Sequence, residues 1–206
     1  INVRESMSAL DIKNNLLGVC DQMYLFEPGD DTTVCVLKAV KPKKVKLFTG
    51  PPSHKEDDAK VVHELMTNAD IRIVSGGTTS QIVARELGVE VKSSTEIYDK
   101  EVPPIAYIHG INLVTEGVLT LSKTIDRLKS LSKSLDSNIF KAKDGASQMA
   151  KLLYSASHIK LLVGRSLNIA NAEISFQRDL ELRLHVIGEL EKILVKLGKI
   201  VTIEYY

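Results

Sequence analysis

Residues 71–88 read IRIVSGGTTSQIVARELG, and this segment sets the pattern for most of the chain. Its first residues include Ile71, Ile73 and Val74, which are β-branched as buried strands prefer, so they predict a strand. The glycine pair that follows permits positive φ and lets a ligand approach the backbone closely. The remaining residues predict a short helix that ends at Gly88.

The start of this helix is a candidate anion site. Gly76 and Gly77 leave the backbone open, and Thr78, Thr79 and Ser80 offer hydroxyls where unpaired N–H groups gather. The helix dipole also favours negative charge at this position. A tight turn without a ligand is the alternative, because a glycine pair is a weak motif and no Gly-Lys-Ser/Thr of a Walker loop follows.

The alternation of strand and helix extends beyond this segment. It predicts an α/β fold with a mostly parallel, Rossmann-like sheet and helices on both faces. Ser53 and Glu56 have the spacing of a capping box at one helix start. The predicted strands cover 45–49, 71–75, part of 107–114, 159–163 and 199–206, and the predicted helices cover 53–67, 79–87, 118–131, 145–155 and 176–197.

Small residues follow four of the predicted strands, at 50–52, 76–79, 115–117 and 164–165. If the strands are parallel, all four turns lie at the carboxyl edge of the sheet, where open α/β sheets bind ligands. The helix that begins near Asp144 starts at the same edge. The predicted ligand-binding residues are therefore Gly76, Gly77, Thr78, Thr79, Ser80, Glu116, Gly117, Asp144, Gly145, Gly164 and Arg165.

Three of these residues have more than one interpretation. Glu116 could accept a hydrogen bond from a sugar hydroxyl or act as a base, or it could be a helix-start carboxylate favoured by the dipole. Asp144 is an N-cap, a ligand contact or both. Arg165 could bind a phosphate or carboxylate, or form a surface salt bridge. The pattern assigns no catalytic residue.

The composition limits the class of protein. The chain has 206 residues, 44% of them hydrophobic, and a formal net charge of +1, which gives no electrostatic case for nucleic-acid binding. No apolar run approaches the length of a membrane span, and the first residues do not resemble a signal peptide. Cys20 and Cys35 lie in apolar segments without metal-ligand spacing. We therefore expect buried thiols in a cytoplasmic protein.

Residues 1–41 differ from the rest of the chain. Ser8 can cap a helix over residues 8–24, an acidic turn follows, and residues 32–40 predict a strand. The basic, proline-containing segment 41–44 marks a domain boundary. We expect one domain over residues 1–41 and an α/β domain over residues 44–206.

Residues 29–37, GDDTTVCVL, resemble the last motif of the metal-dependent serine/threonine phosphatases of the PP2C superfamily, specifically the bacterial stage II sporulation protein E (SpoIIE) family. The predicted helix 8–24 fits the final helix of that family. Later motifs are similar, in order, to the additional C-terminal domain of some SpoIIE-family proteins. These motifs are LFTGPP at 47–52, GGTT at 76–79, VTEG at 114–117, DGAS at 144–147 and VGR at 163–165.

The resemblance implies a role for Asp30 as a ligand of the paired Mn²⁺ or Mg²⁺ ions in an intact phosphatase domain, which acts on phosphoserine or phosphothreonine in a phosphoprotein. The other metal aspartates of the family lie upstream of residue 1. We therefore expect this fragment to be catalytically incomplete and to hold no metal. An Asx-type turn is the alternative role for Asp30 and Asp31.

The expected function is that of the C-terminal region of a SpoIIE-family phosphatase in sporulation signalling. Residues 1–41 would be a helix–strand remnant of the PP2C-type domain. The α/β domain would regulate the phosphatase by binding an anionic small molecule, such as a nucleotide or sugar phosphate. Two alternatives remain open at this point: an α/β enzyme with Glu116 or Asp144 as base, and an interaction module that forms a homodimer through helix 176–197 or the exposed remnant.

Overall fold

A computed structural model describes residues 7–27, 29–133, 141–166 and 175–206, without the side chains of 132, 133 and 175–179. The chain divides into two compact units, Ile1–Lys41 and Pro42–Tyr206. Each unit is described by itself below. None of the described helices combines the length and apolar character needed to cross a membrane.

The first unit contains the predicted helix, α1 (Ala9–Met23). A capping box begins it: the Asp11 N–H donates to Ser8 Oγ, and the Ser8 N–H donates to the Asp11 carboxylate, both at 3.1 Å. No residue of α1 is buried. The helix is therefore stabilised locally, by its cap, and its apolar residues make no core of their own.

The predicted strand over 32–40 is not formed in the structure, where the described residues 31–43 carry no regular secondary structure. Its residues have high β-propensity, but a strand needs a neighbouring strand for its hydrogen bonds. Leu37 is 93% exposed. The expectation of buried thiols is also wrong, because Cys35 is exposed and Cys20 is only half-buried.

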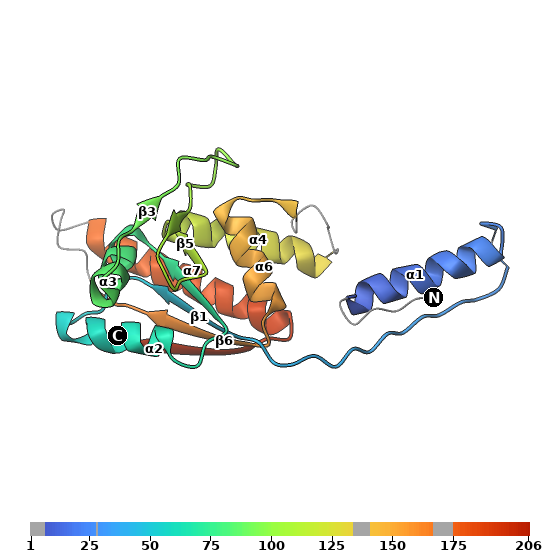
Figure 1. Ribbon diagram of the computed structural model, residues 1–206, viewed down its shortest axis with the longest axis horizontal. Helices are drawn as coiled ribbons and strands as arrows, with labels where there is room; N and C mark the ends of the chain where they lie inside the picture. Colours follow the sequence, from blue (N-terminus) through green and yellow to red (C-terminus); the bar gives the residue numbers. More distant parts are fainter. Residues whose placement is uncertain (1–6, 28, 134–140, 167–174) are drawn as a thin grey trace. The chain divides into compact units, whose positions relative to one another are not determined.

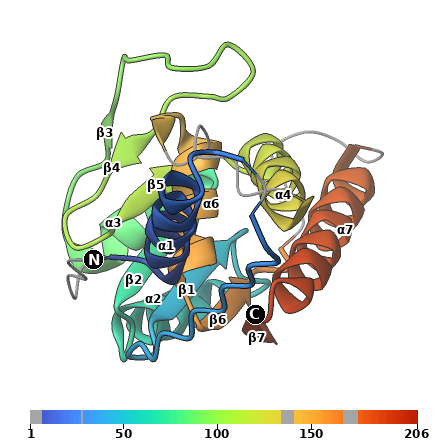
Figure 2. The ribbon, with the colours of Figure 1, turned by 90° about the vertical axis from the view of Figure 1, so that its right-hand side faces the viewer.

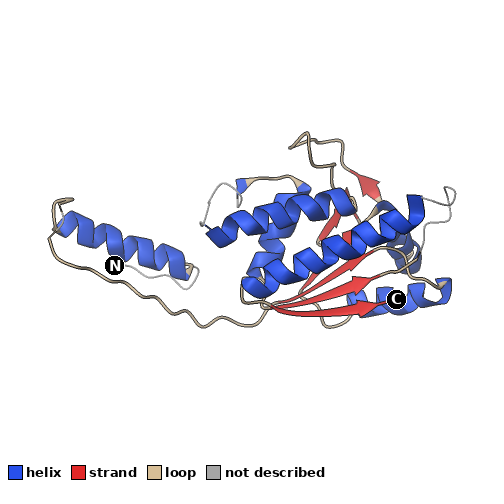
Figure 3. Cartoon of the chain, turned by 180° about the vertical axis from the view of Figure 1, so that it is seen from behind, coloured by secondary structure: helices blue, strands red, loops and turns tan. Residues whose placement is uncertain are grey.

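The second unit is built on a seven-stranded sheet in the order β3-β4-β5-β2-β1-β6-β7 (Figure 3). The five strands from β5 to β7 are parallel, and the short β3 and β4 extend one edge in the antiparallel direction. The predicted mostly parallel α/β fold is thus confirmed. The strands are β1 (Lys44–Thr49), β2 (Ile71–Ser75), β3 (Lys92–Ser93), β4 (Ala106–Tyr107), β5 (Leu113–Thr115), β6 (His158–Val163) and β7 (Ile200–Tyr205).

Helices cover both faces of this sheet (Figures 1 and 2). The larger apolar core lies between the sheet and α4, α6 and α7, and the smaller one lies between the sheet and α2 and α3. Successive side chains of a strand point to opposite faces of the sheet, so Leu47 packs in the first core and Phe48 packs in the second. The helices are α2 (Asp58–Met66), α3 (Gly77–Leu87), α4 (Val118–Lys133), α6 (Gly145–Ser155) and α7 (Ser175–Lys196).

The capping box predicted at Ser53 and Glu56 does not form. The N–H and hydroxyl of Ser53 both donate instead to the carbonyl oxygen of Tyr206, at 3.2 and 3.3 Å. A 3₁₀ turn, η1 (Lys55–Asp57), precedes α2, whose N-cap residue makes no side-chain hydrogen bond. The backbone N–H of Ser53 therefore donates to the carbonyl of Tyr206, directly after β7, and not to the nearby side chain of Glu56.

The point where the strand order reverses, between β1 and β6, is filled by backbone. A Cβ added to Gly164 would lie 2.1 Å from the carbonyl oxygen of Pro51 and 2.2 Å from that of Gly50. The Ser166 N–H donates to the Pro51 carbonyl, and the Arg183 guanidinium donates to the Gly164 carbonyl at 3.2 Å. Open α/β sheets bind ligands in the crevice at this position. Here the two loops pack against each other instead.

We predict that Gly164→Ala lowers the free energy of unfolding by about 2 kcal/mol, because a Cβ must push two backbone carbonyls apart. Gly188→Ala, in α7, is the matched control: a Cβ there meets nothing within 4 Å, so it should stabilise the helix by about 0.5–1 kcal/mol. Urea denaturation of both variants measures the difference. Equal stability of Gly164→Ala and wild type would mean that the two loops are not in contact.

A network of charged side chains lies on the α2 side of the sheet. Glu64 of α2 is 2.6 Å from the ammonium of Lys46 on β1 and 2.8 Å from that of Lys160 on β6, and Lys160 also reaches Glu204 of β7 at 2.6 Å. The hydrogen bonds from Lys160 and Lys46 lower the pKa of Glu64 below its ordinary 4.5. The carboxylate therefore contributes stability above pH 4.5, and this contribution is lost as the pH falls through the lowered pKa.

We accordingly expect wild-type stability to fall more steeply with decreasing pH below 4.5 than that of Glu64→Gln, which cannot titrate there. At neutral pH the variant should be the less stable of the two, because the buried Lys46 loses its carboxylate partner. Urea denaturation at a series of pH values makes the comparison, with the exposed Glu90→Gln as control. Parallel pH profiles for wild type and Glu64→Gln would contradict the expectation.

Candidate functional site

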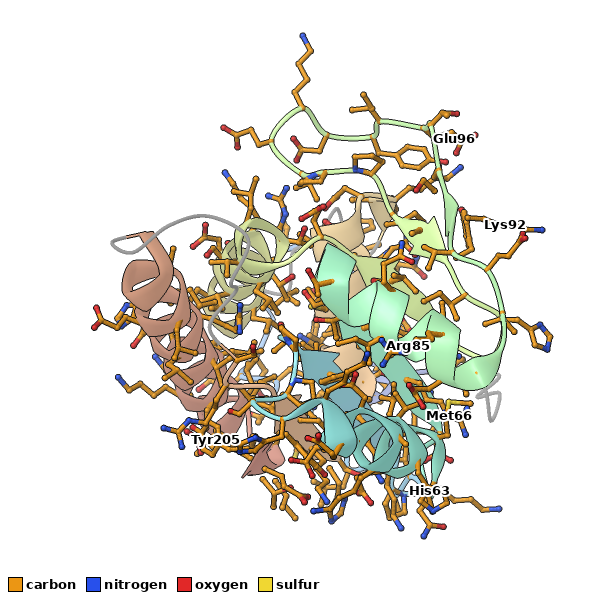
Figure 4. All side chains as sticks on the ribbon, turned by 90° about the vertical axis from the view of Figure 1, so that its left-hand side faces the viewer. His63, Met66, Arg85, Lys92, Glu96 and Tyr205 are labelled. Atoms are coloured by element: carbon orange, nitrogen blue, oxygen red, sulfur yellow. The ribbon has the colours of Figure 1, made fainter. Side chains whose placement is uncertain are left out.

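The predicted site residues lie at the carboxyl edge of the sheet, which Figure 4 shows facing the viewer, but they form two groups. One group follows β2 and β5, which are neighbours. The other follows β6, which is separated from β2 by β1. The two groups differ in whether an open pocket lies beside them.

The corner between β2 and α3 is held by backbone hydrogen bonds around Gly76. This residue has φ +122°, a region that favours glycine, and it is the N-cap of α3. Its N–H donates to the Thr115 carbonyl, and its own carbonyl accepts from the N–H and hydroxyl of Ser80, at 2.8 and 2.7 Å. Ser80 thus stabilises the corner, while the adjoining Gly77 is exposed.

The first turn of α3 keeps unused donors. No side chain caps it, and within the described chain no acceptor pairs with the N–H groups of Gly77, Thr78 and Thr79. Thr79 is 1% exposed, yet its hydroxyl makes no hydrogen bond with any described residue; a Cβ on Gly76 would lie 3.0 Å from its oxygen. An N–H or hydroxyl group without a partner at a helix start is available to a ligand or to water. It fits a position that a ligand or an ordered water completes.

The end of β5 forms the next part of this group. The hydroxyls of Ser75 and Thr115 both donate to the Glu116 carbonyl, at 2.7 and 2.9 Å, and so join the ends of β2 and β5. The Glu116 carboxylate accepts from the Gly117 N–H at 3.2 Å, where α4 begins. This is the helix-start role of Glu116. A Cβ on Gly117 would lie 3.8 Å from the Gly76 Cα, so the two corners adjoin.

A pocket of about 260 Å³ lies on the α3 side of this group. Among the described residues that line it, Glu116 is the one that carries a charge. Prolines, small residues and hydroxyls make up most of the rest, so the pocket suits a compact ligand with polar groups at one side. The lining residues are Gly77, Ser80, Gln81, Val91, Ser93, Pro103, Pro104, Ile105, Ala106, Val114, Thr115 and Glu116.

Asp144 and Gly145 lie next to this group without lining the pocket. Asp144 is buried and accepts from the Ser147 N–H at 2.9 Å, so it is the N-cap of α6. A Cβ on Gly145 would lie 3.1 Å from Ile105 and 3.3 Å from Thr115. Gly145 therefore allows the start of α6 to pack closely on β5 and the segment before β4.

Gly164 and Arg165 belong to the filled crevice between β1 and β6. The Arg165 guanidinium lies 5.7 Å from the centre of the Tyr205 ring, and the backbone N–H of Arg165 donates to the Tyr206 carbonyl. Arg165 is exposed. It follows β6, and both β1 and β2 lie between β6 and β5. The structure does not bring these two residues together with Gly76 and Glu116.

The pocket wall opposite α3 was not among the predicted site residues. It consists of the segment 103–106, which leads into β4, together with Val91 and Ser93 near β3. Pro103-Pro104 stands out in the sequence as a rigid pair directly before a short strand. This signal alone gives no indication that the antiparallel β3–β4 pair extends the sheet and faces the start of α3.

The described residues contain no group of three or more His, Cys, Asp or Glu side chains that could hold a metal ion. Asp30 Oδ1 accepts from the Asp31 N–H at 2.8 Å, and the Thr32 hydroxyl lies 3.5 Å from the Asp30 carbonyl. Both contacts are local, but the Asx-type turn is not formed, because such a turn takes its hydrogen bond from the N–H two residues on, at Thr32. By themselves, these residues do not provide the donor set of a paired Mn²⁺ or Mg²⁺ site.

We predict that Thr79→Val leaves the free energy of unfolding of the ligand-free protein unchanged or raises it slightly, because the lost hydroxyl has no partner. Thr124→Val is the control: its hydroxyl is equally buried but donates to the Thr120 carbonyl at 2.8 Å, so its loss should cost about 1 kcal/mol. Urea denaturation compares the two. A cost for Thr79→Val as large as that for Thr124→Val would show that the Thr79 hydroxyl is already bonded.

Comparisons with protein-family models, with curated proteins and with solved structures gave no match to this chain. Two observations therefore bear on function. One is the geometry at the start of α3, and the other is the motif resemblance at residues 29–37.

Proposed function

We propose that residues 42–206 form a regulatory, ligand-binding domain in the C-terminal region of a SpoIIE-type protein phosphatase. The ligand is an anionic small molecule held at the first turn of α3. The observation that supports this most directly is the uncapped helix start, with three unused N–H groups and the unpaired hydroxyl of Thr79 beside an open pocket. Backbone donors and the helix dipole both favour a phosphate or carboxylate at such a position.

The rest of the pocket narrows the class of ligand. Glu116 would repel an anion placed against it, so the charged group belongs at α3 and an uncharged, hydroxyl-bearing part belongs near Glu116. Carboxylates accept hydrogen bonds from sugar hydroxyls. Pro103 and Pro104 give this part an apolar wall. A sugar phosphate or a nucleotide combines these properties in a molecule that suits a pocket of about 260 Å³.

The phosphatase assignment rests on the motif at residues 29–37 and on the order of the later motifs. In an intact PP2C-type domain, Asp30 would contribute one carboxylate to a pair of Mn²⁺ or Mg²⁺ ions, which activate water for attack on a phosphoprotein. The described residues do not fit this metal pair on their own. We therefore derive no catalytic step from this chain, and place it in a bacterial, cytoplasmic signalling protein whose catalytic residues lie elsewhere.

The proposal is tested by the small molecules that remain bound to the purified chain. Mass spectrometry of the denatured protein should detect a phosphorylated compound in wild type and not in Gly77→Val. The new side chain would occupy the space in front of the N–H groups, while its Cβ meets nothing within 4 Å, so the fold should survive. Gly188→Val, at an equally open position in α7, should retain the compound.

Two outcomes would change this conclusion. Retention of the same compound by folded Gly77→Val, with circular dichroism equal to that of wild type, would move the ligand away from α3. Conversion of the compound to a product during incubation with wild-type protein would indicate an enzyme rather than a regulatory domain.

A further inference from the structure

A second pocket, of about 410 Å³, lies on the opposite face of the sheet from the first, between β4 and α6. Ile105 contributes to the lining of both pockets. The second pocket is lined by two tyrosines, Tyr98 and Tyr107, by two lysines, Lys143 and Lys151, and by no acidic residue among those described. Its chemistry is therefore the reverse of that of the first pocket, which has a carboxylate and no cation.

The two tyrosine rings are exposed although both line a cavity. Tyr98 is 48% exposed and Tyr107 is 56% exposed. Tyr107 projects from β4, and Tyr98 comes from the loop between β3 and β4 that stands out from the sheet in Figure 1. Exposed aromatic rings beside a cavity offer flat surfaces on which another ring can stack.

The loop that carries Tyr98 is anchored by two ion pairs that follow this residue. Asp99 pairs with Arg127 of α4 at 3.0 Å, and Glu101 pairs with Lys123 of α4 at 2.5 Å. The Tyr98 hydroxyl donates to Glu96, which Figure 4 labels on the loop that extends beyond β3. The ring is thus held in position before any ligand arrives, which lowers the entropy lost on binding.

The positive charge of the pocket comes from Lys143 and Lys151. Lys151 of α6 donates to the Ala142 carbonyl at 2.6 Å, and Gln148 donates to the backbone carbonyl of Lys143 at 2.6 Å. The Lys143 ammonium lies 5.9 Å from the centre of the Tyr98 ring. Neither lysine pairs with a carboxylate among the described residues. Two cations beside two aromatic rings favour an anion that also carries a ring.

We propose that this pocket binds a nucleoside phosphate, with its base stacked on Tyr98 or Tyr107 and its phosphate at Lys143 and Lys151. A cavity of this volume suits a molecule of that size. The backbone carbonyls of two lining residues, Ala142 and Lys143, already accept hydrogen bonds, so they offer little to the backbone of a peptide. This site is independent of the one proposed at α3.

The test uses adenosine 5′-monophosphate as probe, with adenosine and inorganic phosphate as controls that each keep one of its two features. Calorimetric titration should give the monophosphate at least tenfold higher affinity than either control. Tyr107→Ala should weaken binding of the monophosphate at least fivefold, and Tyr107→Phe should not, because the ring and not the hydroxyl makes the contact. Lys143→Ala should weaken binding of the monophosphate while leaving that of adenosine unchanged.

Two matched variants separate this site from other surfaces. Tyr205→Ala removes a ring of similar exposure, 51%, at the far edge of the sheet, and should leave the affinity unchanged. Gly77→Val removes the site proposed at the start of α3, and in this background Tyr107→Ala should still weaken binding of the monophosphate at least fivefold. Loss of binding in Gly77→Val with full binding in Tyr107→Ala would place the nucleotide at α3 and overturn the second site. Equal affinity for adenosine and its monophosphate would do so as well.

Discussion

The architecture of the α/β unit depends on the contact between the backbones of two loops, one after β1 and one after β6. Gly50 and Gly164 allow this contact, because at either position a Cβ would lie within 2.7 Å of a backbone carbonyl oxygen of the other loop. The contact fills the crevice at the reversal of strand order, where sheets of this class usually bind ligands. The open space at the carboxyl edge lies two strands further along, where β2 and β5 end.

Where β2 and β5 end, some polar groups are hydrogen-bonded within the protein, and others have no partner among the described residues. The hydroxyls of Ser75, Ser80 and Thr115 accept or donate within the sheet edge and keep the corners rigid. A few residues along the chain from Ser75, the hydroxyl of Thr79 and the first N–H groups of α3 have no partner among the described residues. A rigid frame around unsatisfied donors is the arrangement expected of a preformed ligand site, since the frame prevents these groups from satisfying each other.

The short antiparallel extension, β3 and β4, lies between the two pockets described above. Its strand β4 separates the space on the α3 side from the space on the α6 side, with Ile105 contributing to both. The two spaces differ in charge: one has Glu116 and backbone donors, and the other has Lys143 and Lys151. A phosphate can be accepted in either, but through partial charges of a helix start in the first and through full charges in the second.

The sequence by itself determined the elements that depend on near neighbours. The β-branched run before Ser75, the helix over residues 176–197 and the caps at Ser8 and Asp144 all depend on residues close in sequence, so periodicity and capping rules predict them. The tertiary structure decided what depends on distant partners. Residues 32–40 have no neighbouring strand with which to pair among the described residues. Ser53 donates its hydrogen bonds to the carbonyl of Tyr206, and Arg165 lies apart from the corner at Gly76. One side of the candidate site consists of turns that lie directly after a strand, and the sequence predicts these turns. The pocket wall at 103–106 and the order of the strands depend on long-range pairing, which local sequence does not encode.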